Sequence, residues 1–134
     1  MHEAGTLKNQ RRTGWWMAGV RDSESVAEHS WRTSLIASVL ASMEGADPAR
    51  AAFAEYEARE TAEAACAKDA DKLECLSQGM EYRARGHGSA QRWIDNSRAR
   101  IKTRGGRALA DAALTGEPVD WLRAAMGEDR RSGS

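Results

Sequence analysis

The chain has 134 residues, which is enough for one domain with a modest core and too few for a second independent domain. Its 20 basic and 20 acidic side chains cancel, so no overall field favours nucleic acid or an anionic membrane, and any anion site must be local. No apolar run approaches the roughly 20 residues that span a bilayer, and the N-terminus lacks the order of a signal peptide, so we expect a cytoplasmic protein.

The predicted elements begin with an irregular arm. Residues 1–22 contain three glycines around Trp15 and Trp16, which interrupt any helical pattern over that segment. Beyond it, no segment alternates polar and apolar residues, alanine is abundant, and only two prolines occur. The pattern therefore predicts an all-α fold in a single domain over 1–134.

The first clear helix is predicted to start at Ser25. Ser25 and Glu28 form a capping box, in which each side chain accepts a hydrogen bond from the backbone N–H of the other, and Gly45 supplies a stop. Apolar residues recur at helical spacing between these ends, and His29 lies on the same side, so its ring is expected to point inward. The other members of this predicted stripe are Val26, Thr33, Leu35, Ile36, Val39, Leu40 and Met43.

Two more helix starts follow. Asp47 and Pro48 form a start signal, because aspartate caps a helix and proline fits its first turn. This helix is expected to reach about Glu60, although its apolar residues are few and small. Thr61 is the predicted cap of a third helix that continues to Arg85. The core stripe of that helix consists of Leu73, Leu76 and Met80.

Glycines divide the rest of the chain. A fourth helix is expected over 90–103, two glycines at 105–106 are expected to end it, and a short fifth helix is expected over 107–114. A last turn is predicted from Pro118 onward. Residues 127–134 are expected to be a disordered tail.

The two cysteines are expected to be reduced thiols. Cys66 and Cys75 are nine positions apart on the predicted third helix, about 13 Å along its axis. The Cα atoms of a disulfide lie within about 7 Å of each other. A zinc site built on both cysteines is not expected either, because they lack i, i+3 or i, i+4 spacing and no histidine is near.

His29 and two aspartates are the candidate metal ligands, and each also has an ordinary structural explanation. A histidine on the inner side of a helix can bind a metal, or it can be a hydrogen-bonded core residue. Asp69 and Asp71 point about 200° apart on a regular helix, so they cannot chelate one ion together. Both aspartates also fit a solvated helix face.

Arg11 and Arg12 are candidate phosphate-binding residues. A guanidinium matches the oxygens of a phosphate, and Gly14, which follows Thr13, allows the backbone to approach closely. A pair of arginines is also common on a surface arm. Taken alone, this pair therefore identifies no ligand.

The order of these residues along the chain resembles a known family. The first block consists of Leu7-Lys8, Arg11 to Trp15, Val20 and Glu24 to Ser30. The second block runs from Lys68 to Leu76 and continues through Gln78, Glu81, Tyr82 and Gly86. Together they resemble the HD-domain phosphohydrolases, and among these the 5'-deoxynucleotidases.

The resemblance implies an HD-like helical bundle that releases phosphate from nucleoside or deoxynucleoside 5'-monophosphates with a divalent cation. In that family the ion is held by a first histidine, an adjacent His-Asp pair and a distant aspartate, a set that suits Mn, Co, Zn or Mg. The first histidine matches His29, and the distant aspartate matches Asp71. The resemblance also assigns the substrate wall to Arg12, Thr13, Gly14 and Trp15.

One part of the family pattern is missing. None of the three histidines, His2, His29 and His87, is followed by aspartate, so the adjacent His-Asp pair cannot be formed. The segment that carries this pair, with central helices of the bundle, is expected to be missing between Phe53 and Ala54. A metal at the two remaining positions would have two protein ligands instead of four, and weak binding is expected.

Two functions are therefore open. The first is a metal-dependent phosphohydrolase acting on nucleoside 5'-monophosphates. The second is a non-catalytic helical protein that binds nucleotides or serves assembly, or an inactive deletion product. Loss of core helices would expose apolar surface on the helix after Ser25, so we expect a homo-oligomer, in one form a domain-swapped dimer.

Overall fold

Five helices have defined bounds in the computed structural model of the chain. They are α3 (Val26–Glu44), α4 (Pro48–Ala51), α5 (Ala62–Ala84), α6 (Ala90–Arg100) and α7 (Arg104–Thr115). The structure describes residues 6, 10–12, 14–15, 19–21, 23–54 and 60–116. Within these ranges no strand forms, and an isolated antiparallel bridge joins Arg11 and Ser25. The predicted all-α fold class is confirmed.

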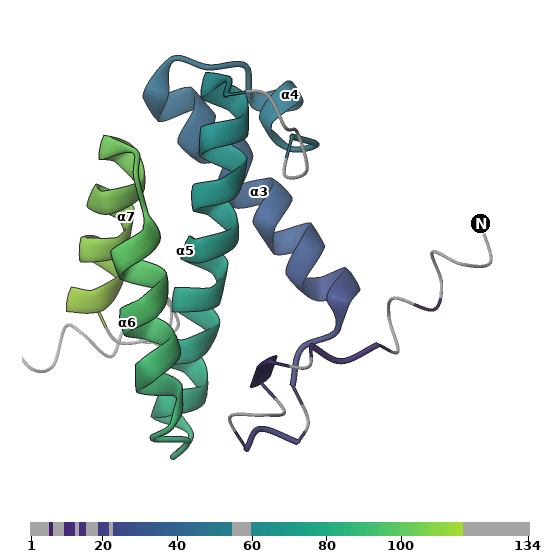
Figure 1. The fold of residues 1–134 in the computed structure, drawn as a ribbon, viewed down its shortest axis with the longest axis vertical. Coiled ribbons are helices and arrows are strands. Elements are labelled where there is room, and N and C mark those ends of the chain that lie inside the picture. Colours follow the sequence, from purple (N-terminus) through teal and green to yellow (C-terminus); the bar gives the residue numbers. More distant parts are fainter. Residues whose placement is uncertain are drawn as a thin grey trace, which may run out of the picture.

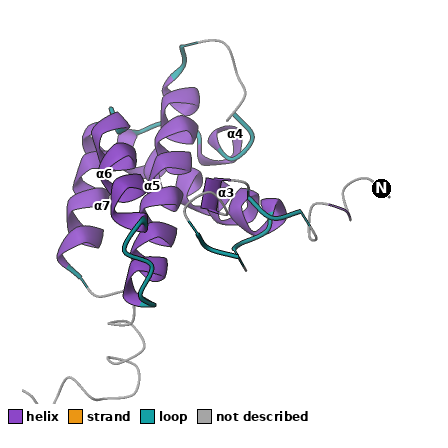
Figure 2. Cartoon of the chain, turned by 60° about the horizontal axis from the view of Figure 1, so that its bottom comes forward, coloured by secondary structure: helices purple, strands orange, loops and turns teal. Residues whose placement is uncertain are grey.

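The long helix α5 is the centre of the bundle. Figure 1 shows α3 on one side of α5, α6 and α7 on the other side, and α4 near the N-terminal end of α5. The second view, in Figure 2, shows the same arrangement of helices around α5. In the described part of the chain, no helix is both long enough and apolar enough to cross a membrane.

Two buried clusters hold the helices together. The larger one takes side chains from all five helices and includes the predicted core residues Leu73, Leu76 and Met80 of α5. The smaller one consists of Trp15, Val20, Tyr82 and Ala90, with Trp93 packed against it. This second cluster attaches the N-terminal arm to the end of α5 and the start of α6, and thereby fixes the arm beside the candidate site.

The predicted ends of α3 are confirmed. Ser25 Oγ accepts a hydrogen bond from the N–H of Glu28 at 3.1 Å, and Glu28 Oε2 accepts one from the N–H of Ser25 at 2.7 Å. Gly45 has a φ of 73°, a left-handed conformation that glycine adopts without strain. These caps fix where α3 begins and ends, and His29 is buried as predicted.

The predicted apolar stripe of α3 is partly wrong. Thr33 and Leu40 are buried, but the residues that pack beside them are the small Ala37 and Ala41. The large side chains on the side of α3 away from the core stay exposed, with exposed fractions of 66%, 49%, 56% and 50% for Trp31, Leu35, Val39 and Met43. The alanines turn toward α5 because small side chains let two helices approach closely. We call the four exposed residues the α3 stripe.

The predicted second helix is much shorter than expected. Asp47 Oδ1 accepts hydrogen bonds from the N–H groups of Ala49 and Arg50, so the start signal is confirmed. The helix nevertheless ends at Ala51, and residues 55–59 lie outside the described ranges. Its only buried residue is that alanine. Among its described residues 47–54, no large apolar side chain lies in the core, and tertiary packing usually supplies most of the stability of a short helix.

The third helix agrees with the prediction, whereas the last two differ from it. Thr61 caps α5 as predicted, by accepting a hydrogen bond from the N–H of Ala64. The helix predicted over 90–103 ends at Arg100, and the glycines predicted to interrupt the chain lie inside α7. The predicted turn after Pro118 and the tail 127–134 lie outside the described residues.

Close packing explains why glycines occupy the start of α7. A Cβ atom on Gly105 would lie 2.6 Å from Glu44 Oε1 and 2.9 Å from a methyl group of Leu40, both on α3. A Cβ atom on Gly106 would lie 2.8 Å from Asp69 Oδ2 on α5. The glycines therefore allow the first turn of α7 to approach both helices, and they do not break the helix.

Candidate metal centre

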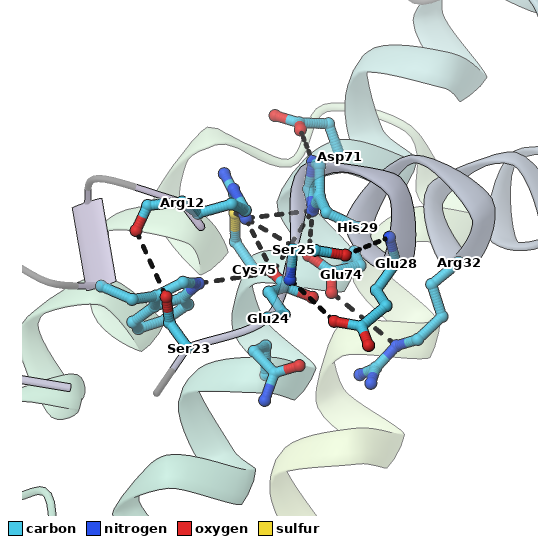
Figure 3. A network of polar contacts seen from close by, with 12 residues as sticks. Arg12, Ser23, Glu24, Ser25, Glu28, His29, Arg32, Asp71, Glu74 and Cys75 are labelled. Atoms are coloured by element: carbon cyan, nitrogen blue, oxygen red, sulfur yellow. Dashed lines mark hydrogen bonds and ion pairs between the residues drawn. The ribbon is translucent and has the colours of Figure 1, made fainter. Parts of the chain in front are cut away.

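His29 lies near the start of α3 and points toward α5. Its Nε2 lies 2.8 Å from Asp71 Oδ1, and its Nδ1 is hydrogen-bonded to Glu74 Oε2. Figure 3 shows the ring between these two carboxylates. Asp71 and Glu74 are three positions apart, so they share one side of α5. The structure thus brings together His29 and Asp71, which are 42 positions apart in the chain.

Sequence reasoning did not identify two buried carboxylates of this site, Glu24 and Glu74. Glu24 Oε1 lies 3.6 Å from His29 Nδ1, and the N–H of Glu24 donates to the Tyr82 hydroxyl at 2.7 Å. Glu74 is completely buried. Helical spacing could have identified Glu74, because it lies one helical turn after Asp71. Glu24 lies before the helix starts, so helical spacing could not reveal it.

Arg12, predicted to face the substrate, is at the centre of the ionic network. Its Nη1 lies 3.1 Å from Glu24 Oε1, 3.4 Å from Glu74 Oε2 and 3.0 Å from His29 Nδ1. It also donates to Cys75 Sγ at 3.3 Å. A guanidinium with four polar neighbours stabilises the two glutamates, and its side chain is only a quarter exposed. Arg12 therefore supports the site directly.

The other three predicted substrate residues have different positions. Trp15 is buried, packs edge-on against Tyr82 with ring centroids 4.9 Å apart, and donates to Glu24 Oε1 at 3.4 Å. Its place is therefore in the core beneath Glu24, with no face open to a substrate. Gly14 is half-buried, and a Cβ there would lie 3.0 Å from the Trp93 ring. Thr13 lies outside the described residues.

The network shifts the ionisation of its members. Burial disfavours the charge of His29, but hydrogen bonds with three carboxylates outweigh this effect and raise its pKa to about 11. Burial also raises the pKa of Glu74. Burial acts the same way on Glu24 and Asp71, but hydrogen bonds with His29 hold the pKa of each of these two carboxyls well below its usual range. Together these hydrogen bonds favour the protonated His29 ring over the neutral one.

Asp69 is excluded from this centre by its own contacts. Asp69 Oδ2 accepts hydrogen bonds from the N–H of Thr103 at 2.7 Å and from its hydroxyl at 2.6 Å. The N–H of Lys102 also donates to this carboxylate, at 3.0 Å. Asp69 is buried, so the alternative of a solvated helix face is wrong for it. Of the two candidate aspartates, Asp71 alone faces His29.

Comparison with known proteins identifies the family. The family model described as HD domain matches residues 4–52 and 44–112, which together span most of the chain. The chain belongs to the HD domain family. This family points to a superfamily of metal-dependent phosphohydrolases.

Two solved structures are similar to this HD domain. One is a protein of Archaeoglobus fulgidus titled predicted coding region AF1432, with 31% identity and a TM-score of 0.72 over 85% of this chain and 90% of that one. The other is titled crystal structure of genomics APC5600, with 28% identity and a TM-score of 0.76 over 90% of this chain and 95% of that one. A search of curated proteins finds no match.

HD domains generally bind divalent metals, and two donor groups among the described residues of this one could hold an ion. The atoms of each group lie within 4.8 Å of one another. One group is His29, Asp71 and Cys75, and the other is Glu24, His29 and Glu74. The second group is fully buried, and Arg12 Nη1 contacts all three of its members, whereas in the first group it contacts Cys75 and His29 but not Asp71.

The group that contains Asp71 fits a metal better. The 2.8 Å between His29 Nε2 and Asp71 Oδ1 is close to the roughly 3 Å that separates neighbouring ligands of one ion with bonds of about 2.1 Å. The Asp71 side chain is 20% exposed, so an ion could reach it.

One oxygen of Glu74, Oε1, has no hydrogen bond although it is buried. Arg32 Nε lies 3.8 Å from this oxygen.

A pocket of about 420 Å³ adjoins the other side of the network. It shares Glu24 with the site, and Arg32 connects its wall to Glu74. Trp31 offers an aromatic surface there, and Gln78 and Tyr82 offer polar groups. The remaining lining residues are Arg11, Ser23, Glu28, Glu81 and Arg85. The three arginines of the lining can contact a phosphate, and its three glutamates balance their charge.

Proposed function

We propose that this HD domain hydrolyses the phosphate ester of a nucleoside or deoxynucleoside 5'-monophosphate with a divalent cation bound at His29 and Asp71. The observation that carries the proposal is the 2.8 Å approach of His29 Nε2 to Asp71 Oδ1. These are the two positions that match the family's first histidine and distant aspartate. A divalent ion there would supply an activated water and offset the charge of the phosphoryl oxygens.

The surrounding residues have supporting roles in this proposal. Glu74 accepts a hydrogen bond from His29 Nδ1, which fixes the ring so that Nε2 faces Asp71. Arg12 holds Glu74 and Glu24 in place. In this proposal the pocket, which is lined by Arg32 but not by His29 or Asp71, holds the base against Trp31, and the phosphate extends from it toward the ion.

Activity should depend on the ion and on Asp71. With Mn, Co, Zn or Mg supplied in turn to the chelator-treated protein, we expect phosphate release from a deoxynucleoside 5'-monophosphate with at least one of them. Asp71→Asn should reduce release by more than about 100-fold, because loss of even an outer-shell partner of a metal costs about 10–100-fold. Release is measured as inorganic phosphate.

The matched control is Asp95→Asn, which makes the same chemical change on the exposed side of α6. Asp95→Asn should keep wild-type release, and both variants should show the wild-type circular dichroism spectrum. If the wild-type protein releases no phosphate with any of the four ions, the proposed activity is wrong.

The α3 stripe supports a second proposed function, that of an assembly surface. We propose that it pairs with the same stripe on a second copy of the chain. In an antiparallel pairing, Trp31 would face Met43 of the other copy, and Leu35 would face Val39, so the contact is self-complementary. The chain has no net charge at pH 7, so two copies would not repel each other at long range.

Sedimentation measures this association. The wild-type chain should sediment as a dimer at micromolar concentration, and Val39→Glu should shift it to a monomer because the charge would be buried in the contact. Leu114→Glu adds the same charge to a partly exposed apolar position of α7 and should leave the dimer intact. A wild-type monomer, or equal effects of both substitutions, would contradict the proposed surface. If the dimer is domain-swapped, its subunits should exchange slowly with those of a labelled dimer, because the swapped segments must first detach.

A further inference from the structure

The two cysteines of the chain lie in different chemical environments. Cys66 belongs to the apolar core cluster, among residues such as Leu73. Cys75 belongs to neither apolar cluster. Instead it lies beside the polar site, with its Sγ 3.3 Å from Arg12 Nη1 (Figure 3). Both are free thiols, as predicted. Apolar packing explains the first cysteine and does not explain the second.

The position of Cys75 on α5 relates it directly to the proposed metal site. It follows Asp71 by four residues, and side chains four apart on a helix are neighbours on one face. Its sulfur, a carboxylate oxygen of Asp71 and a ring nitrogen of His29 all lie within 4.8 Å of one another. Imidazole, carboxylate and thiolate from two helices are three of the protein ligands that zinc accepts.

We propose that Cys75 is a third metal ligand, and that the centre therefore takes a thiophilic divalent ion, Zn²⁺ or Co²⁺, in preference to Mg²⁺ or Mn²⁺. The inference rests on the proposed function, because it adds a ligand to the site formed by His29 and Asp71. Cys75 would partly compensate for the absence of the adjacent His-Asp pair. Its sulfur lies on the helix that already carries Asp71 and raises the number of protein ligands from two to three.

Charge and softness both favour this assignment. An aspartate and a thiolate together carry two negative charges, which balance one divalent cation in a partly buried place. Sulfur ligands select soft or borderline ions, whereas Mg²⁺ and Mn²⁺ prefer oxygen. The competing group of Glu24, His29 and Glu74 contains no sulfur and would favour harder ions. The preferred ion therefore discriminates between the two groups.

Cobalt spectroscopy of the full chain tests the proposal without any assay of activity. The chelator-treated protein is titrated with Co²⁺, and thiolate-to-cobalt charge transfer is followed in the near ultraviolet. The wild-type chain and Cys66→Ala should both show the band. Cys75→Ala should lose it, and should bind Zn²⁺ more weakly by at least about tenfold in competition with a chelating dye. The two substitutions are chemically identical and lie on the same helix.

Further variants separate the possible failures. Cys75→Asp should bind Co²⁺ without the sulfur band and should shift preference toward Mn²⁺, and a wild-type circular dichroism spectrum confirms that it folds. If Cys75→Ala keeps the band and the Zn²⁺ affinity while Asp71→Asn loses the affinity, Cys75 is not a ligand and the proposed function stands. If the wild-type protein binds neither ion, the inference and the metal site of the proposed function both fail.

Discussion

Replacing His29 by alanine is expected to lower the free energy of unfolding of the metal-free protein by about 3–5 kcal/mol. The substitution removes the positive ring that lies between Asp71 and Glu74 and within 3.6 Å of Glu24. The carboxylates that remain are largely buried, and removal of one partner leaves their charge without compensation. Urea unfolding in the presence of a chelator, followed by circular dichroism, measures the change.

A second substitution isolates the cause. Glu74→Gln removes one of the negative charges, so the double variant His29→Ala/Glu74→Gln should lose less stability than the sum of the two single variants. Strict additivity would show that the ring acts through packing alone.

The free energy of unfolding of the wild-type protein should depend on pH through the charge of His29. The pKa of His29 is raised from 6.5 to about 11 on folding, so its contribution to the free energy of unfolding is complete below pH 6.5 and is lost as the pH rises toward 11. His29→Ala should not show this loss of stability. A wild-type curve that is flat over this interval would contradict the charged ring.

Replacing Asp69 by alanine should lower the free energy of unfolding by about 2–4 kcal/mol, because buried or partly buried donors would lose their acceptor. The carboxylate accepts hydrogen bonds from the N–H groups of Lys102 and Thr103 and from the Thr103 hydroxyl. Thr103 in turn caps α7 by accepting from the N–H of Gly106. The substitution should therefore weaken the contact between α7 and α5, and thermal unfolding measures the loss of stability.

The matched control is Asp69→Asn, which keeps one acceptor oxygen in nearly the same volume. It should retain a large part of the stability, since neutral hydrogen bonds replace charge-assisted ones. Equal losses for the two variants would show that the negative charge itself, and not the acceptor geometry, holds the start of α7. Metal binding should be unaffected in Asp69→Asn, because this residue faces away from His29.

Local signals in the sequence predicted the starts of α3, α4 and α5, whereas the start of α7 was predicted three residues too late. Ser25, Asp47 and Thr61 cap helices as expected, because a cap depends on a few neighbouring atoms of the same segment. The pairing of His29 with Asp71 was also predicted, but only through the resemblance to a family. Helical periodicity alone placed the histidine inward and could not name its partner.

Features that depend on distant packing could not be predicted in the same way. Periodicity placed Leu35 and Val39 in the core, but the contact with α5 selects the smaller alanines of α3. The glycines at 105–106 had the pattern of a break, and only the approach of α3 and α5 explains them as helical. Glu24 was missed because the N-terminal arm carries it to the site from outside any helix.

Trp31 has two neighbourhoods, since it forms part of the pocket wall and is also the first residue of the α3 stripe. Whatever covers the stripe therefore reshapes the mouth of the pocket. Under the two proposed functions, the measured affinity and turnover of this chain would therefore depend on protein concentration. The mouth of the pocket would have one shape in the monomer of a dilute sample and another in the dimer of a concentrated one.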